Sequence, residues 1–99
     1  MDSKSFTVYE SQDYSVRLEY DDHLAILHLP SVSKFNKTVL QKMQQKVIEL
    51  LDFLSDLGYN GVWSGCPSSD EKTNRLLHLL GFNFIQNDNN IAVYNLGVA

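Results

Sequence analysis

Cysteine, proline and long apolar runs are all scarce in this chain of 99 residues. Cys66 is the only cysteine, which excludes an internal disulfide and favours a reducing, cytoplasmic compartment. The three histidines are scattered, and none has ligand spacing with Cys66, so we expect no metal site. The longest apolar runs, Leu24–Leu27 and Leu76–Leu80 with its interrupting His78, fall far short of the roughly 18 residues of a spanning helix. The composition therefore predicts a small soluble domain with no membrane segment.

Positive charge is also in short supply. Eight Lys and Arg residues face twelve Asp and Glu residues, so the formal net charge is −4 and the pI is about 5.1. Nucleic-acid binding usually rests on a basic surface, so we expect no nucleic-acid partner. The first residues, Met1–Lys4, carry no apolar segment, so we expect no secretory signal. The length suits one domain over residues 1–99.

Alternating and β-branched segments predict six strands. They are Ser5–Glu10, Tyr14–Tyr20, His23–Leu29, Gly61–Cys66, Phe82–Gln86 and Ile91–Leu96. Pro30 is expected to end the third strand, because proline cannot donate a ladder hydrogen bond. The run Asn87–Asn90 predicts a hairpin turn between the last two strands.

Apolar spacing at steps of one, three and four predicts a long helix of about 20 residues. The stripe consists of Val39, Leu40, Met43, Val47, Leu50, Leu51, Leu54 and Leu57. Asn36 or Ser33 can cap its start, and Gly58 stands where a terminating glycine belongs. A second helix is predicted from a capping box of Ser68 and Glu71, and it runs to about Leu80 before Gly81.

The predicted order is β-β-β-α-β-α-β-β, an α/β (α+β) domain with a mixed, twisted sheet. The long helix joins the third and fourth strands, so these two should be parallel and connected right-handedly. The strands of the flanking hairpins should be antiparallel, with both helices packed on the sheet.

This order, together with a helix that ends in Gly81-Phe82 before a final hairpin, resembles the GNAT N-acetyltransferase superfamily. The resemblance covers about Ser5 to Leu96, and it is strongest to the short GNAT-like proteins of bacteriophages. It implies a GNAT-like fold that lacks the usual front part, a viral protein in the host cytoplasm, and acetyl-CoA as the cofactor of an active member.

Three departures from the family pattern predict that acetyl-CoA-dependent catalysis is lost. The glycine-rich turn that cradles the coenzyme A pyrophosphate corresponds here to Ser31–Thr38, which contains no glycine. The tyrosine that acts as general acid corresponds to Leu77, which cannot transfer a proton. The strand and two helices that precede the first hairpin in the family have no counterpart. We therefore expect a binding or accessory protein without a cofactor, whose partner is another protein or a second copy.

The alternative is a divergent acetyl-CoA-dependent N-acetyltransferase, with the pantetheine arm between the third and fourth strands. The resemblance then implies that Ser64 or Cys66 protonates the leaving thiolate. The cofactor-binding candidates are Leu29, Lys34, Asn36, Lys37 and Thr38. A third hypothesis is an inhibitor that mimics an acidic surface.

The long helix carries its charges in an unusual order. Lysines 34, 37, 42 and 46 crowd its start, whereas Glu49, Asp52 and Asp56 crowd its end. The helix dipole favours the opposite order. Three interpretations stay open: a solvated face, a docking surface for another protein, or a phosphate site.

Cys66 follows a strand and precedes a helix, a position that can lower a thiol pKa and activate the sulfur. His28, at the end of the neighbouring strand, could approach it. The alternative is that Cys66 is a small buried apolar residue. We expect His78 on a polar helix face and Trp63 in packing.

Overall fold

The computed structural model describes residues 4–10, 12, 14–21, 24–32 and 36–97. The predicted order of strands and helices is confirmed over these residues. The elements are β1 (Lys4–Glu10), β2 (Tyr14–Tyr20), β3 (Ala25–Val32), α1 (Lys37–Asp56), β4 (Gly61–Pro67), α2 (Glu71–Leu79), β5 (Asn83–Asp88) and β6 (Ile91–Gly97).

The strands form one six-stranded mixed sheet in the order β1-β2-β3-β4-β6-β5. The predicted parallel pair, β3 and β4, is confirmed, and the other neighbours are antiparallel. Both helices pack on one face of the sheet, and the amide Nε2 of Gln44 on α1 donates to the carbonyl of Leu79 at the end of α2, at 3.0 Å. Within the described residues, no helix covers the opposite face.

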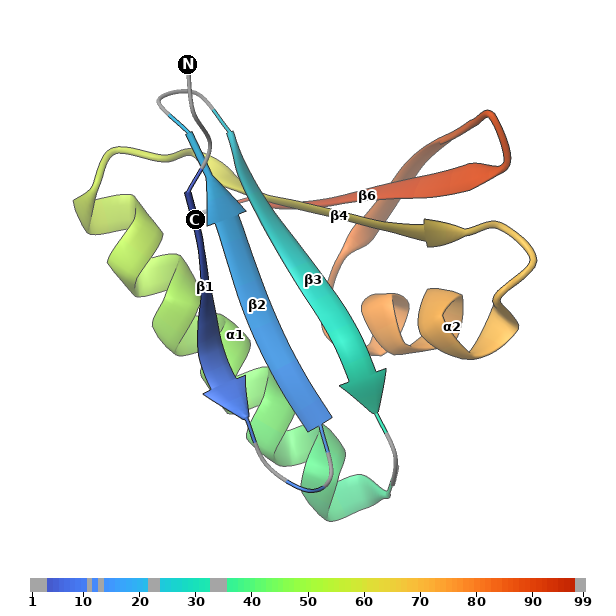
Figure 1. Cartoon of the computed structure of the whole chain (residues 1–99), viewed down its shortest axis with the longest axis horizontal. Helices are drawn as coiled ribbons and strands as arrows, with labels where there is room; N and C mark the ends of the chain where they lie inside the picture. The colour runs from blue at the N-terminus through green and yellow to red at the C-terminus, as the bar shows by residue number, and fades with distance from the viewer. Residues whose placement is uncertain (1–3, 11, 13, 22–23, 33–35, 98–99) are drawn as a thin grey trace.

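The join between β3 and β4 is short. Their register contains a single pair, Ile26 with Trp63, whereas the β4–β6 ladder spans all seven residues of β4. Figure 1 shows the two strands close together near their starts and diverging toward their arrowheads. The sheet is therefore split into a β1–β2–β3 part and a β4–β6–β5 part.

Pro30 does not end β3, which continues to Val32, so this expectation was wrong. The register between β2 and β3 shifts between Ser15 and Arg17, so that Leu29 and Pro30 together stand opposite Val16. A β-bulge of this kind accepts proline, because the extra residue has no ladder partner. His23, the predicted start of the strand, lies outside the described residues.

α1 begins at a cap that the sequence predicted. The side chain of Asn36 accepts a hydrogen bond from the backbone N–H of Val39 at 2.9 Å. Gly58 follows the helix with φ +91°, a conformation that favours glycine. The other proposed cap, Ser33, lies outside the described residues.

α2 begins differently from the expectation. Its cap is Asp70, whose carboxylate accepts from both the backbone N–H and the hydroxyl of Thr73, so the predicted Ser68–Glu71 capping box is wrong. Ser68 lies in the connection from β4, where its hydroxyl donates to the carbonyl of Asn90 at 3.0 Å. Ser68 is thereby held by the β5–β6 turn. Gly81, with φ +96°, ends the helix as predicted.

The final hairpin turns in two residues. Asn89 and Asn90 have φ of 51° and 66°, and β5 continues to Asp88, so the turn is tighter than the predicted Asn87–Asn90 run. Positive φ at both central residues is the geometry that matches the right-handed twist of paired strands, and asparagine tolerates it.

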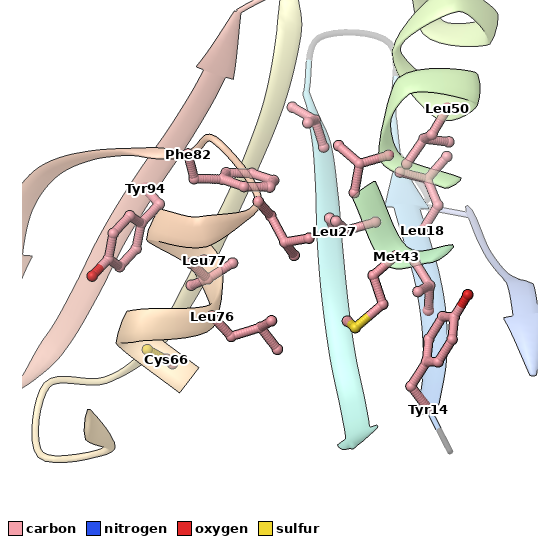
Figure 2. Packing of buried hydrophobic residues seen from close by; sticks show 14 of the residues in the cluster. Tyr14, Leu18, Leu27, Met43, Leu50, Cys66, Leu76, Leu77, Phe82 and Tyr94 are labelled. Carbon is pink, nitrogen blue, oxygen red and sulfur yellow. The ribbon is translucent and has the colours of Figure 1, made fainter. Parts of the chain in front are cut away.

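One core joins the two parts of the sheet. Figure 2 shows Leu27 of β3 between Leu18 and Met43 on one side and Leu76 and Leu77 of α2 on the other. The α1 stripe is buried as predicted at Val39, Met43, Val47, Leu50 and Leu54. Leu57 is 55% exposed, contrary to expectation, because it is the cap residue that follows the last helical residue, Asp56. Over the residues described, neither helix is long and apolar enough to cross a membrane.

Candidate functional site

The diverging ends of β3 and β4 enclose a cavity of about 240 Å³. It lies between the third and fourth strands, where the alternative implied by the resemblance would put the pantetheine arm. Its lining includes Leu29, Ser64 and Cys66, so three of the predicted site residues come together. Arg17, His28, Asp70 and Thr73 complete its polar lining.

Ser64 is buried, and its hydroxyl already has a hydrogen-bond acceptor. Its hydroxyl donates to the carbonyl of Leu27 at 2.8 Å, across the parallel join of the sheet. The bond lies beside the single register pair, Ile26 with Trp63, and it ties β4 to β3 just before they diverge. The Ser64 hydroxyl proton is therefore directed to the backbone of β3.

Cys66 is 6% exposed, as expected for a small buried apolar residue. Burial raises the pKa of the thiol, and the nearby Asp70 carboxylate raises it further. The N-terminus of α2, which follows Cys66 in the sequence, does not lower the pKa of the thiol, because the Asp70 carboxylate caps it. The sulfur is thus protonated at neutral pH and is a poor nucleophile.

Asp70 keeps its negative charge beside the cavity. Its pKa is lowered first by the hydrogen bond from the Thr73 hydroxyl, at 2.7 Å, and next by the Thr73 backbone N–H, at 3.1 Å. Asp70 was not predicted from the sequence, because Ser68 and Glu71 also fit a capping box. The signal that could have found it is the Asp-x-x-Thr spacing, which allows one carboxylate to bind both groups of Thr73.

The side chains of Glu19 and His28 are hydrogen-bonded on the helix-free face of the sheet. The Nε2 atom of His28 lies 3.0 Å from the Oε1 atom of Glu19, and both side chains are about one-third exposed. Arg17 is the register partner of His28 and also lines the cavity, so its guanidinium group lies at this edge. The alternation of Tyr14–Tyr20 could have placed Arg17 and Glu19 on one face.

Asn74 fixes the wall formed by the connection from β4 to α2. Its amide donates to the carbonyl of Asp70 at 2.8 Å, and its oxygen accepts from the Tyr94 hydroxyl at 2.6 Å. Burial raises the pKa of Tyr94. The phenol thus stays protonated and continues to donate to Asn74.

The proposed phosphate-binding residues lie apart from this cavity. Asn36, Lys37 and Thr38 are exposed at the start of α1, and none of them lines the cavity. Lys34 lies outside the described residues. Leu77, which the resemblance compared with the family's tyrosine, is fully buried in the core.

A second cavity, of about 510 Å³, lies at the opposite ends of β3 and β4. Trp63 lines it together with Leu24 and Tyr59, and the Tyr59 hydroxyl donates to the carbonyl of Asp21. His78 is exposed on α2, as expected. In the part of the chain that the structure describes, no group of three His, Cys, Asp or Glu side chains could hold a metal ion.

No family model matches the chain, and neither a curated protein nor a solved structure matches it.

Proposed function

We propose that this chain is a GNAT-like protein that has lost acetyl-CoA-dependent catalysis and acts as a binding or accessory protein in the cytoplasm of a phage-infected host. The observation that carries the proposal is that Leu77 is apolar and buried. The resemblance places it at the position of the family's general acid, and it is fully buried in the core. No proton can pass from this position to a leaving thiolate.

The cavity supports the same proposal. Ser64 already donates to the carbonyl of Leu27, so its proton is not available to a leaving thiolate. At about 240 Å³ the cavity is smaller than the roughly 300–1,000 Å³ of most small-molecule sites. It suits one side chain of a partner protein better than a whole coenzyme. The polar groups at its edge, Arg17 and His28, would orient that side chain.

The second candidate is a divergent N-acetyltransferase, and the divergence of β3 and β4 favours it. An acyl-pantetheine arm would enter between the strands, where the bulge at Leu29 leaves backbone groups outside the ladder. The acceptor amine would attack the thioester carbonyl, the C–N bond would form as the C–S bond breaks, the amine nitrogen would release a proton to water, and the coenzyme thiolate would take up a proton. Cys66 is protonated and lines the cavity, so it is the residue in position to supply that proton.

Backbone amide shifts measured during titration with acetyl-CoA to about 1 mM separate the two candidates. Our proposal expects no saturable shift. Saturable shifts in both strands that flank the cavity and at the start of α1 would overturn it in favour of the acetyltransferase. A parallel titration with adenosine 3′,5′-bisphosphate is the control, because it carries the phosphates without the pantetheine arm. Shifts common to both ligands would report phosphate binding alone.

If acetyl-CoA binds, turnover with a panel of amines follows. The Cys66→Ala variant would then lower the rate constant for turnover more than it changes KM, because a proton donor acts only in the transition state. Ser55→Ala, on the exposed end of α1, is the matched control.

A further inference from the structure

The second cavity, at the starts of β3 and β4, has the size of a small-molecule site. Its volume of about 510 Å³ is more than twice the 240 Å³ of the candidate site, and it falls within the roughly 300–1,000 Å³ of most such sites. Its lining comes from the start of β3, from residues 57–61 between α1 and β4, and from Trp63 and Asn95. Because it lies at the other end of the two strands, an inference about it does not rest on the proposed function.

Hydrogen bonds fix both walls of this cavity. On one wall, the carboxylate of Asp21 accepts from the backbone N–H of Leu24 at 2.8 Å, and the backbone N–H of Asp21 donates to the carbonyl of Leu24 at 3.0 Å. On the other wall, the backbone N–H groups of Gly58 and Tyr59 donate to carbonyls near the end of α1, both at 3.0 Å. The Tyr59 hydroxyl joins the two walls by donating to the carbonyl of Asp21. The cavity is therefore preformed, which lowers the entropy lost when a ligand binds.

Three polar side chains of the lining are available to a ligand. The amides of Asn60 and Asn95 and the indole N–H of Trp63 have no hydrogen-bond partner among the described residues. Asn60 is exposed, whereas Asn95 and Trp63 are half-buried. Each amide offers two donor hydrogens and an acceptor oxygen, and the indole offers one donor. A ligand with several donors and acceptors could therefore be bound by these groups together.

Apolar surface accompanies the polar groups. Leu24 is 46% exposed and Leu57 is 55% exposed, and both line the cavity. Trp63 lines it as well and is the register partner of Asn95, so an aromatic ring and an amide lie side by side on one face of the sheet. The lining thus places a flat apolar ring next to hydrogen-bonding groups.

This lining restricts the class of ligand. None of the described residues that line the cavity carries a charge, so a phosphate or carboxylate group would meet no cation among them. A wholly apolar ligand would leave the amides without partners. A neutral sugar has an apolar ring face and neighbouring hydroxyls, each of which can donate and accept. We propose that this cavity binds a neutral carbohydrate, with the Trp63 ring against one sugar ring and the amides of Asn60 and Asn95 hydrogen-bonded to its hydroxyls.

The fluorescence of Trp63 tests the proposal directly, because it is the only tryptophan of the chain. The full chain is titrated with the methyl glycosides of glucose, galactose, mannose and N-acetylglucosamine, each to about 20 mM. We expect a saturable change with at least one of them and a dissociation constant of about 0.1–10 mM. The same glycoside should shift the nuclear magnetic resonance signals of the Trp63 indole and of the Asn60 and Asn95 side-chain amides. No saturable response to any of the four would overturn the proposal.

Two other ligands test the assigned chemistry. Cyclohexanol has an apolar six-membered ring but a single hydroxyl, so it should bind about tenfold more weakly than the best glycoside, or less tightly still. Equal binding would mean that apolar contact alone fills the cavity, and it would overturn the carbohydrate assignment. Adenosine carries a flat base without a phosphate. Tighter binding of adenosine than of every glycoside would overturn the assignment in favour of base stacking.

A pair of variants tests the role of the amides. Asn60→Ala, in the exposed connection before β4, should raise the dissociation constant of the best glycoside about fivefold or more and leave the urea midpoint unchanged. Asn87→Ala is the matched control, because it removes an exposed amide of β5 that is not among the described lining residues. It should leave the dissociation constant unchanged. Equal effects of the two variants would contradict the proposed site.

Discussion

The Cys66 thiol shows how neighbouring residues decide the chemistry of a side chain. A strand end ahead of a helix usually lowers a thiol pKa, because the helix N-terminus stabilises a thiolate. Here burial and the Asp70 carboxylate both act in the opposite direction. Asp70 is itself held in its ionised form by Thr73. The same cap that begins α2 therefore keeps the sulfur beside it protonated.

This arrangement predicts how stability depends on pH. Because the thiol pKa is higher in the folded chain than in the unfolded chain, the unfolded chain loses its proton first as the pH rises. The free energy of unfolding should thus fall above the ordinary thiol pKa, and the fall should stop once the folded thiol also ionises. Urea unfolding across this pH range measures it. Tyr94, whose pKa is also raised, contributes in the same direction at higher pH.

Two variants isolate the contribution of Cys66. Cys66→Ala should flatten the lower part of this pH dependence. Asp70→Asn keeps a capping oxygen but removes the charge, so the pKa of the thiol should fall and its alkylation by iodoacetamide should become faster at a given pH. Unchanged alkylation in the Asp70→Asn variant would mean that Asp70 does not affect the sulfur.

At the scale of elements, the join between β3 and β4 is the narrowest connection in the sheet. One register pair and one buried side-chain hydrogen bond, from Ser64 to the carbonyl of Leu27, hold the strands together before they part. The parting opens the cavity, and the bulge at Pro30 lets β3 stay paired with β2 while it turns away from β4. The cavity is thus a consequence of how two elements pair.

Removal of the Ser64 hydroxyl should weaken this join. In Ser64→Ala, the carbonyl of Leu27 loses a buried donor, and we expect a loss of about 1–2 kcal/mol in the free energy of unfolding. Urea unfolding followed by circular dichroism measures the loss. Ser55→Ala removes a hydroxyl at an exposed site on α1 and should change the free energy by less than about 0.5 kcal/mol. Equal effects would mean that the Ser64 bond contributes nothing.

At the scale of the whole molecule, the core opposes the division of the sheet. Side chains from α1, α2 and four strands form one buried cluster, with Leu27 and Leu77 completely buried where the two parts meet. Neither part could separate from the other without exposing this apolar surface to water. A sheet divided by a short join is therefore still one folding unit.

We accordingly expect a single cooperative unfolding transition. Trp63 stands at the one register pair between β3 and β4, so its fluorescence reports on that join, whereas far-ultraviolet circular dichroism reports on both helices. The two signals should give the same urea midpoint and slope. Different midpoints would show that the parts unfold separately. Leu77→Ala should shift both curves together, with a loss of about 2–5 kcal/mol.

Local chemistry allowed the sequence to predict most elements. The helical spacing of apolar residues predicted α1 and its buried stripe. Asn36 marked the start of α1 through its capping side chain, and Gly58 and Gly81 marked helix ends through a backbone conformation that favours glycine. The connection through a long helix predicted that β3 and β4 are parallel. These properties depend on residues within a few positions of one another or on the length of one connection. Both kinds of information can be read directly from the sequence.

The remaining features depended on residues far apart in the sequence. The prediction that Pro30 ends β3 was wrong, because the bulge opposite Val16 lets the strand accept a proline. The prediction that Ser68 caps α2 was wrong, because its hydroxyl donates to the β5–β6 turn instead. The candidate site likewise depends on which groups reach the cavity. The sequence by itself determined the order of elements, the helix caps at Asn36 and the glycine ends, since local sterics and hydrogen bonds specify them. Only the tertiary structure decided the pKa of Cys66 and the pairing of Glu19 with His28, because burial and charge proximity exist only once distant strands are brought together.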